Sequence, residues 1–213
     1  MRWHISGRLK VAPEHCAARA LDCMGKPRIE AYERFREKYF KLNRRYGKEQ
    51  YLVPYLISSH PGCTWEDAVQ LAEWLNKQGH MPEQVQDFYP TPGTLATCMW
   101  YTGLDPRTME PVFVSRTPHD KALQRALMQW RKPRNRKLVL EALRRTGRED
   151  LIGYGKHCLV RPDKGTPAGG GPHTAPPSRD RAGKKKSDTR LRVEKHSSRP
   201  VRKKGWAKPK KKK

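Results

Sequence analysis

The chain has 213 residues, enough for one domain of ordinary size with an appendage. Its formal net charge is +25 and only 35% of its residues are hydrophobic, so any large partner is expected to be acidic or polyanionic. The sequence contains no run of 18 apolar residues and no secretory segment. We therefore expect a cytoplasmic protein that makes no use of a membrane.

The first predicted strand, residues 9–12, is short and apolar and runs into a polar loop that contains Glu14 and His15. Pro27 then precedes a segment in which apolar side chains recur every three to four residues, with basic side chains between them. This spacing predicts an amphipathic helix that ends near Gly47.

The second predicted strand, residues 51–58, is apolar almost throughout, which is typical of a strand covered on both faces. Pro54 lies inside it. Because proline has no N–H to donate to a neighbouring strand, we expect an edge position or a bulge there.

A second helix is predicted to begin at Thr64, with Asp67 three residues later as a variant of the capping box, and to end at Gly79. The third predicted strand, residues 85–88, leads into a loop in which two prolines fix the backbone, residues 89–93.

These elements alternate as strand, helix, strand, helix, strand. The alternation predicts parallel βαβ units, whose active groups lie in the loops after the strands. Three parallel strands leave two open edges and one poorly covered face. We therefore interpret residues 1–94 as the second half of a larger barrel.

The chain beyond residue 94 differs in character. Residues 95–101 are predicted to form a short helix or strand, residues 103–118 to be irregular, and residues 119–130 and 135–146 to form two helices. We interpret residues 95–162 as a helical αα appendage.

The last segment, residues 163–213, contains 18 Lys and Arg against four Asp and Glu, and so carries +14 of the net charge of +25. It has almost no large apolar residue. Such a segment cannot bury enough surface to offset the entropy of ordering it, so we expect a disordered basic tail.

The five cysteines form an odd set without paired spacing. They are Cys16, Cys23, Cys63, Cys98 and Cys158. We expect reduced thiols, and we assign no metal to them.

Several blocks of sequence resemble a known family. The segment from Tyr55 to Asp67, which reads YLISSHPGCTWED, resembles the fifth-strand motif of radical S-adenosylmethionine (SAM) enzymes related to the methylthiotransferases. The segment from Val85 to Thr94 is similar to the sixth strand of these enzymes and its Pro-Gly-Thr exit. The blocks LKVAPEH, GKEQYLVPY, MWYTG and DLIG, in this order between residues 4 and 162, resemble the C-terminal half of the YgiQ family of radical SAM proteins.

The resemblance implies an incomplete (β/α) radical SAM barrel that contains strands four to six. It also implies SAM and a [4Fe-4S] cluster as cofactors of the full-length family. The cluster of such enzymes is held by Cys-x-x-x-Cys-x-x-Cys, which does not occur in this sequence. We therefore expect the C-terminal portion of an iron–sulfur enzyme of uncharacterised reaction, not catalytic alone and dependent on an N-terminal half or a partner chain.

Seven residues at the ends of the three strands are candidates for contact with SAM, as implied by the resemblance and by the position of active groups in parallel barrels. They are Glu14, His15, Ser58, His60, Gly62, Phe88 and Tyr89. Each also has a structural interpretation: a polar loop for Glu14 and His15, a local hydrogen bond for His60, and core packing for Phe88. No catalytic residue is assigned.

A different class of function is suggested by the basic tail. Its cations would attract the phosphates of RNA or DNA, and its tryptophan could stack on an unpaired base. The candidate residues are Lys184, Lys185, Lys186, Arg202, Lys203, Lys204 and Trp206. The alternatives to this non-enzymatic nucleic-acid-binding protein are a solubilising tail and non-specific attraction of polyanions.

Overall fold

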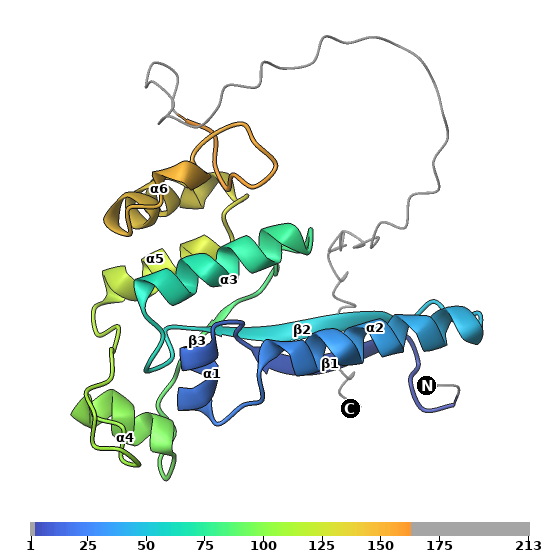
Figure 1. Ribbon diagram of the computed structural model, residues 1–213, viewed down its shortest axis with the longest axis horizontal. Helices are drawn as coiled ribbons and strands as arrows, with labels where there is room; N and C mark the ends of the chain where they lie inside the picture. The colour runs from blue at the N-terminus through green and yellow to red at the C-terminus, as the bar shows by residue number, and fades with distance from the viewer. Residues whose placement is uncertain (1–2, 163–213) are drawn as a thin grey trace, which may run out of the picture. The chain divides into compact units, whose positions relative to one another are not determined.

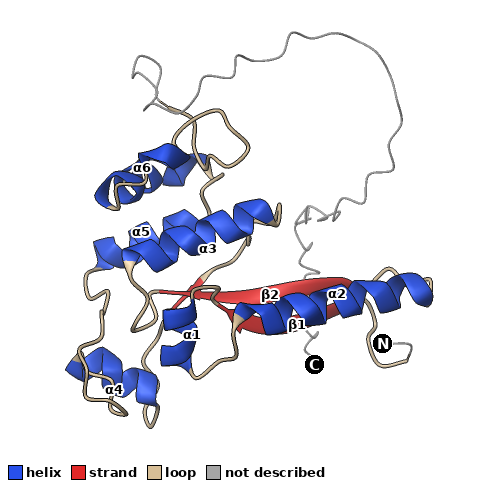
Figure 2. Ribbon diagram, viewed as in Figure 1, coloured by secondary structure: helices blue, strands red, loops and turns tan. Residues whose placement is uncertain are grey.

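The structure of the chain is a computed structural model that describes residues 3–162, all of which belong to one compact unit, Met1–His173. These residues form a mixed α/β fold with a small three-stranded parallel sheet and six α-helices (Figures 1 and 2). The tail, with its seven candidate nucleic-acid-binding residues, lies outside the described residues.

The sheet has the strand order β1–β2–β3 with parallel pairing throughout. Its strands are β1 (Arg8–Glu14), β2 (Tyr51–Ser58) and β3 (Gln86–Asp87). The predicted parallel strands are thus confirmed, although β3 is shorter than expected. Because β1 and β3 each pair on one side within the described chain, both are edge strands.

A bulge lies beside the proline of β2. Val11 pairs with Pro54, and the next pair joins Glu14 to Leu56. Between these two pairs β1 therefore has one more residue than β2. Glu14 has a positive φ of 63°. The expected irregularity at Pro54 is therefore present, and it lies in the partner strand.

The two faces of β2 differ in exposure. Leu56 and Ser58 are buried on the face that packs against helices, whereas Tyr55, which points to the other face, is 48% exposed. The expectation that β2 is covered on both faces was therefore wrong for the described residues. Because side chains alternate along a strand, Tyr55 shares its face with Tyr51, Val53 and Ile57, which are half-buried, so the described chain leaves this face partly uncovered.

The two helices predicted between the strands are present as α2 (Ile29–Arg45) and α3 (Trp65–Lys77). Thr64 and Asp67 form the complete capping box of α3. A further helix, α1 (Ala18–Met24), was not predicted, because it has only seven residues and no side-chain cap.

The region after β3 contains α4 (Leu95–Thr102), α5 (Pro118–Met128), the 3-10 turn η1 (Pro133–Asn135), α6 (Arg136–Arg145) and the 3-10 turn η2 (Glu149–Leu151). The predicted αα pair is confirmed. Helix α5 lies against α3 on one side and α6 on the other, as Figure 1 shows. Their core includes Leu71, Leu75, Leu123, Leu127 and Leu143.

All five cysteines are free thiols. Among residues 3–162, no helix has both the length and the apolar character required to cross a bilayer.

Candidate functional site

The ends of the three parallel strands lie close together, as their direction requires. Two contacts establish this. The Ser58 Oγ at the end of β2 donates to Asp87 Oδ1 of β3, and His15 Nε2 after β1 lies 3.3 Å from the Cys63 Sγ in the loop after β2. The structure therefore brings together the loops in which the candidate residues were expected.

His15 and Cys63 form a buried polar pair. His15 Nδ1 accepts a hydrogen bond from the backbone N–H of Ala17 at 3.0 Å, so the ring proton of a neutral His15 is on Nε2 and points at sulfur. Burial lowers the pKa of His15 to about 4, and burial raises the pKa of the Cys63 thiol far above its ordinary value. At neutral pH both groups are uncharged. The pair is therefore a structural link between two loops, since a nucleophilic cysteine requires a thiolate.

His60 is also buried, with 6% of its surface exposed. Its Nδ1 lies 2.7 Å from the Pro61 carbonyl oxygen and donates to it in the neutral ring, and its edge meets Phe88 at a centroid distance of 5.0 Å. Burial lowers the pKa of His60, so the unprotonated Nε2 remains an acceptor at neutral pH. The local hydrogen bond that the sequence left open as an alternative is present.

The Asp87 carboxylate at the end of β3 has two side-chain partners. Asp87 accepts from Ser58, and its Oδ2 lies 3.0 Å from the Arg125 guanidinium on α5. Sequence reasoning did not select Asp87, although its position at a strand end is the same signal that selected Ser58.

The exposed edge of β1 has its own cation. Lys26 Nζ lies 3.0 Å from Glu14 Oε1 and 3.4 Å from the Ala12 carbonyl oxygen. The same lysine lines an open groove of about 270 Å³ beside the strand. The apolar side chains of that groove include Val11, Ile29 and Phe35.

Gly62 makes a close approach within the protein. Its φ is +86°, and a Cβ built there would lie 2.3 Å from Cys23 Sγ on α1. Its N–H donates to the Phe113 carbonyl at 2.8 Å. A side chain at position 62 would therefore collide with α1 of the same chain.

The loop after β2 is held from α5 by Gln124, which is 1% exposed. Its Oε1 accepts from Ser59 N–H at 3.0 Å, and its Nε2 donates to the Cys63 carbonyl at 3.3 Å and to Ser115 Oγ at 2.9 Å. Ser59 has a φ of 60°, and its Oγ is buried without a hydrogen-bond partner. No local pattern identifies Gln124, because two of its three partners, Ser59 and Cys63, lie 65 and 61 residues earlier in the chain.

The two remaining candidate residues, Phe88 and Tyr89, differ in solvent exposure. Phe88 is 8% exposed and packs at the end of β3, whereas Tyr89 is 78% exposed. Among the described residues, no group of three or more His, Cys, Asp and Glu side chains is placed to hold a metal ion.

The sequence was compared with known protein families. Residues 83–212 match the family described as "Domain of unknown function (DUF3362)". This match includes β3, the helices that follow it and most of the basic tail.

The curated relatives are named UPF0313 proteins. The chain is 55% identical over 171 residues to one from Clostridium perfringens, covering 80% of this chain and 26% of the relative. It is 52% identical over 161 residues to one from Methanocella arvoryzae, 76% and 27% of the two chains, and 54% identical over 158 residues to one from Methanosarcina acetivorans, 74% and 21%. The chain thus spans about a quarter of the length of these relatives. No solved structure matches it significantly.

Proposed function

Because the chain belongs to the DUF3362 domain family and its curated relatives are UPF0313 proteins, the YgiQ family, we propose that it forms the C-terminal portion of a radical SAM enzyme. In this proposal β1, β2 and β3 are three strands of a (β/α) barrel, and the loops after them contribute to its cofactor side. The reaction of the whole enzyme is not specified by these residues.

The observation that supports the proposal is the sheet with one uncovered face. In a closed parallel barrel, helices cover the outside and the inward side chains meet those of other strands. The uncovered face here includes Lys10 and Tyr55, with the Lys10 ammonium 5.5 Å from the Tyr55 ring centre. Parallel sheets are normally covered on both faces, so this face is expected to meet elements beyond the described ones, and in a barrel these are the inward side chains of the other strands.

The described residues do not fit a [4Fe-4S] cluster. Such a cluster requires three cysteines side by side, and among residues 3–162 no group of three or more His, Cys, Asp and Glu side chains is placed to hold a metal ion. The sequence also lacks the Cys-x-x-x-Cys-x-x-Cys motif. We therefore propose that the cluster is held by residues outside this chain and that the chain is not catalytic alone.

The candidate SAM contacts fit only in part. Five of the seven, His15, Ser58, His60, Gly62 and Phe88, are buried against the protein's own atoms. Glu14 and Tyr89 remain accessible, and the unpartnered Ser59 Oγ adds one polar atom to this end of the sheet. We propose that the chain supplies a rim of the SAM site, with Glu14 accepting a hydrogen bond and Tyr89 covering an apolar ring.

The test is complementation. The chain is co-expressed with the part of the Clostridium perfringens UPF0313 protein that does not align with it. We expect a stable complex that, after anaerobic reconstitution with iron and sulfide, converts SAM to 5′-deoxyadenosine when reduced. A stoichiometric complex with a loaded cluster but without this product would contradict the proposal.

A pair of variants tests the barrel face in the same experiment. Tyr55→Lys places a charge on the face proposed to be interior, and we expect loss of the complex. Tyr101→Lys changes a tyrosine on α4 that is more exposed, at 78% against 48% for Tyr55, and should leave the complex intact. Equal behaviour of the two variants would argue against an interior role for Tyr55.

The second candidate function is binding of RNA or DNA through residues 163–213, which carry +14 of the net charge. Deleting these residues should then remove most of the binding to a labelled single-stranded RNA at 0.1 M salt. Unchanged binding would exclude the tail as the main contact.

A further inference from the structure

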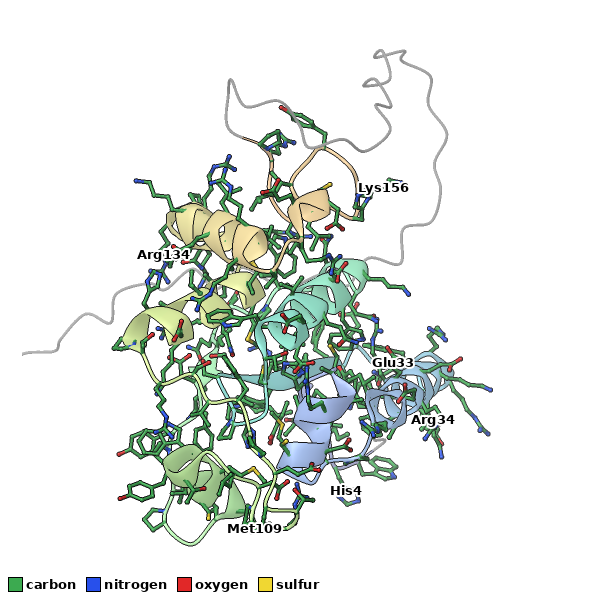
Figure 3. The ribbon with its side chains drawn as sticks, turned by 60° about the vertical axis from the view of Figure 1, so that its left-hand side comes forward. His4, Glu33, Arg34, Met109, Arg134 and Lys156 are labelled. Carbon is green, nitrogen blue, oxygen red and sulfur yellow. The ribbon has the colours of Figure 1, made fainter. Side chains whose placement is uncertain are left out.

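The turn between α5 and α6 carries the densest group of cations in the described chain. Its sequence from residue 131 to 137 is RKPRNRK, with five cations and no acid in seven residues. We call these residues the basic turn. Figure 3 labels Arg134 there. Charge runs on a surface are usually only solvated, so the inference depends on how this one is held.

The basic turn is rigid. Asn135 Nδ2 donates to the Gln129 carbonyl at 3.1 Å, and Gln129 Nε2 donates to the carbonyl oxygens of Pro82 and Glu83 at 3.1 and 2.7 Å. Lys132 also donates to the Glu83 carbonyl at 3.0 Å. These bonds hold the backbone of the turn, so binding would have to order only the side chains of the cations and not the turn itself.

Four of the five cations of the basic turn lack a carboxylate partner within the described chain. Arg131, Lys132, Arg134 and Lys137 form no ion pair with a described carboxylate. Partial burial and, to a smaller extent, the charge of Arg134 lower the pKa of Lys132, while the Glu83 carboxylate opposes the shift.

The orientation of α6 increases this positive potential. The first turn of α6 contains Arg136 and Lys137 and no acid, and its N-terminal N–H groups have no side-chain cap. Cations at a helix N-terminus oppose the helix dipole, which favours anions there. The arrangement is unfavourable for the isolated fold and favourable for a bound anion.

We propose that the basic turn binds the phosphodiester backbone of a nucleic acid, independently of the tail and of the barrel. Among the described residues 116–162 the one large apolar side chain that is exposed is Tyr154. A protein interface would need an apolar core, and insertion into a membrane surface would need an apolar anchor. Electrostatic contact with a phosphate backbone needs neither, and guanidinium groups bind phosphate oxygens in pairs.

The experiment uses the full chain and a labelled 20-nucleotide single-stranded RNA in fluorescence anisotropy. The test variant is R131Q/K132Q/R134Q/K137Q. The control, R34Q/K38Q/K41Q/R45Q, removes the same charge from the exposed side of α2, where Figure 3 labels Arg34 on the opposite side of the view. Circular dichroism checks that both fold.

For the test variant we expect about 10²-fold weaker binding at 0.1 M salt and a salt slope reduced by about 2 to 3, since each lost phosphate contact removes about 0.7. The control should change both quantities far less. Equal losses in the two variants would overturn the proposal, because only total charge would then matter.

Two further readouts separate the basic turn from the tail and from acidic proteins. RNA should protect Arg131 and Arg134, but not Arg34, from an arginine-modifying glyoxal reagent read out by mass spectrometry; no protection in the turn overturns the proposal even if the tail binds RNA. Poly-glutamate of equal charge should compete poorly. Efficient competition would instead assign the turn to acidic proteins.

Discussion

Gly62 is the residue at which the fold is least able to accept a side chain. Its φ is positive, and a Cβ would meet Cys23 Sγ at 2.3 Å and Cys23 Cβ at 2.9 Å. Rotation of the Cys23 side chain can move the sulfur, but the Cβ moves only with α1. We predict that Gly62→Ala lowers the free energy of unfolding by about 3 kcal/mol, combining left-handed strain with overpacking. Urea denaturation followed by circular dichroism measures this.

Gly25→Ala is the matched control. Gly25 also has a positive φ, +65°, but a Cβ there has nothing within 4 Å, so its cost is limited to about 1 kcal/mol. Equal losses at the two positions would show that the contact with Cys23 has no energetic weight.

His15 should give the stability a dependence on pH. Its pKa is about 4 in the folded chain and 6.5 when exposed, so between these values the unfolded state binds more protons. Stability is therefore complete above pH 6.5 and falls as the pH decreases toward 4, by up to about 3 kcal/mol from this one group.

The measurement compares the urea midpoint at pH 7.5 and pH 4.5. His15→Asn keeps an acceptor for the Ala17 N–H but cannot titrate, so its loss between the two pH values should be smaller than that of the parent chain. His60 and His80 also have a lowered pKa, so part of the dependence remains. An identical pH dependence in both proteins would refute the assignment.

For single residues, the sequence indicated which side chains lie at the strand ends better than it indicated their hydrogen-bond partners. The strand-end rule correctly placed His15, Ser58 and His60 near one another. It did not indicate that His15 would be bonded to Cys63, since the pairing depends on the curvature of two loops 48 residues apart.

Among the elements, the contact between the loop after β2 and α5 rests on Gln124. Replacing it with Leu removes three hydrogen bonds and leaves the Ser59 N–H buried without an acceptor. We predict a loss of about 3 kcal/mol for Gln124→Leu. Gln70→Leu on the exposed side of α3 should cost less than about 0.5 kcal/mol. Thermal or urea denaturation of both variants checks this, and similar losses would contradict the role given to Gln124.

Elements with a clear period or cap were predicted well. Helix α2, the capped helix α3, strand β2 and the α5–α6 pair have nearly the expected bounds. The seven-residue α1 was missed because its signals are too short, and β3 is shorter than its apolar run suggested. An apolar run indicates which residues are buried, whereas the length of a strand depends on how many residues pair with the neighbouring strand.

For the whole molecule, net charge and exposed apolar surface act against each other. Tyr89, Leu95, Tyr101 and Met109 are between 54% and 78% exposed around α4, while the charge of +25 keeps copies apart. Raising NaCl from 50 to 500 mM shortens the Debye length to a few ångströms. We predict that this raises the weight-average mass in sedimentation velocity.

The double variant L95K/M109K should remain monomeric at 500 mM NaCl, because it removes exposed apolar surface. Q70K/Q86K adds the same charge at exposed positions elsewhere and should still associate. Association that decreases with salt would contradict this balance of forces.

The parallel α/β class followed from the sequence because alternation of strand and helix restricts the topology. The uncovered face of β2 did not follow. Tyr55 and Leu56 are both apolar, and sequence alone does not distinguish a residue that meets helices of its own chain from one on an open face. The same limit applies to the barrel, which remains a proposal supported by family membership.

Lys26 affects which strands could pair along the free edge of β1. A strand that pairs along this edge must displace the ammonium from the Ala12 carbonyl, and it gains by offering a carboxylate in exchange. A second copy of β1 instead brings Arg8 and Lys10, whose charges repel those already present. Pairing of two β1 strands along this edge is therefore disfavoured, and pairing with an acidic strand of different sequence is favoured.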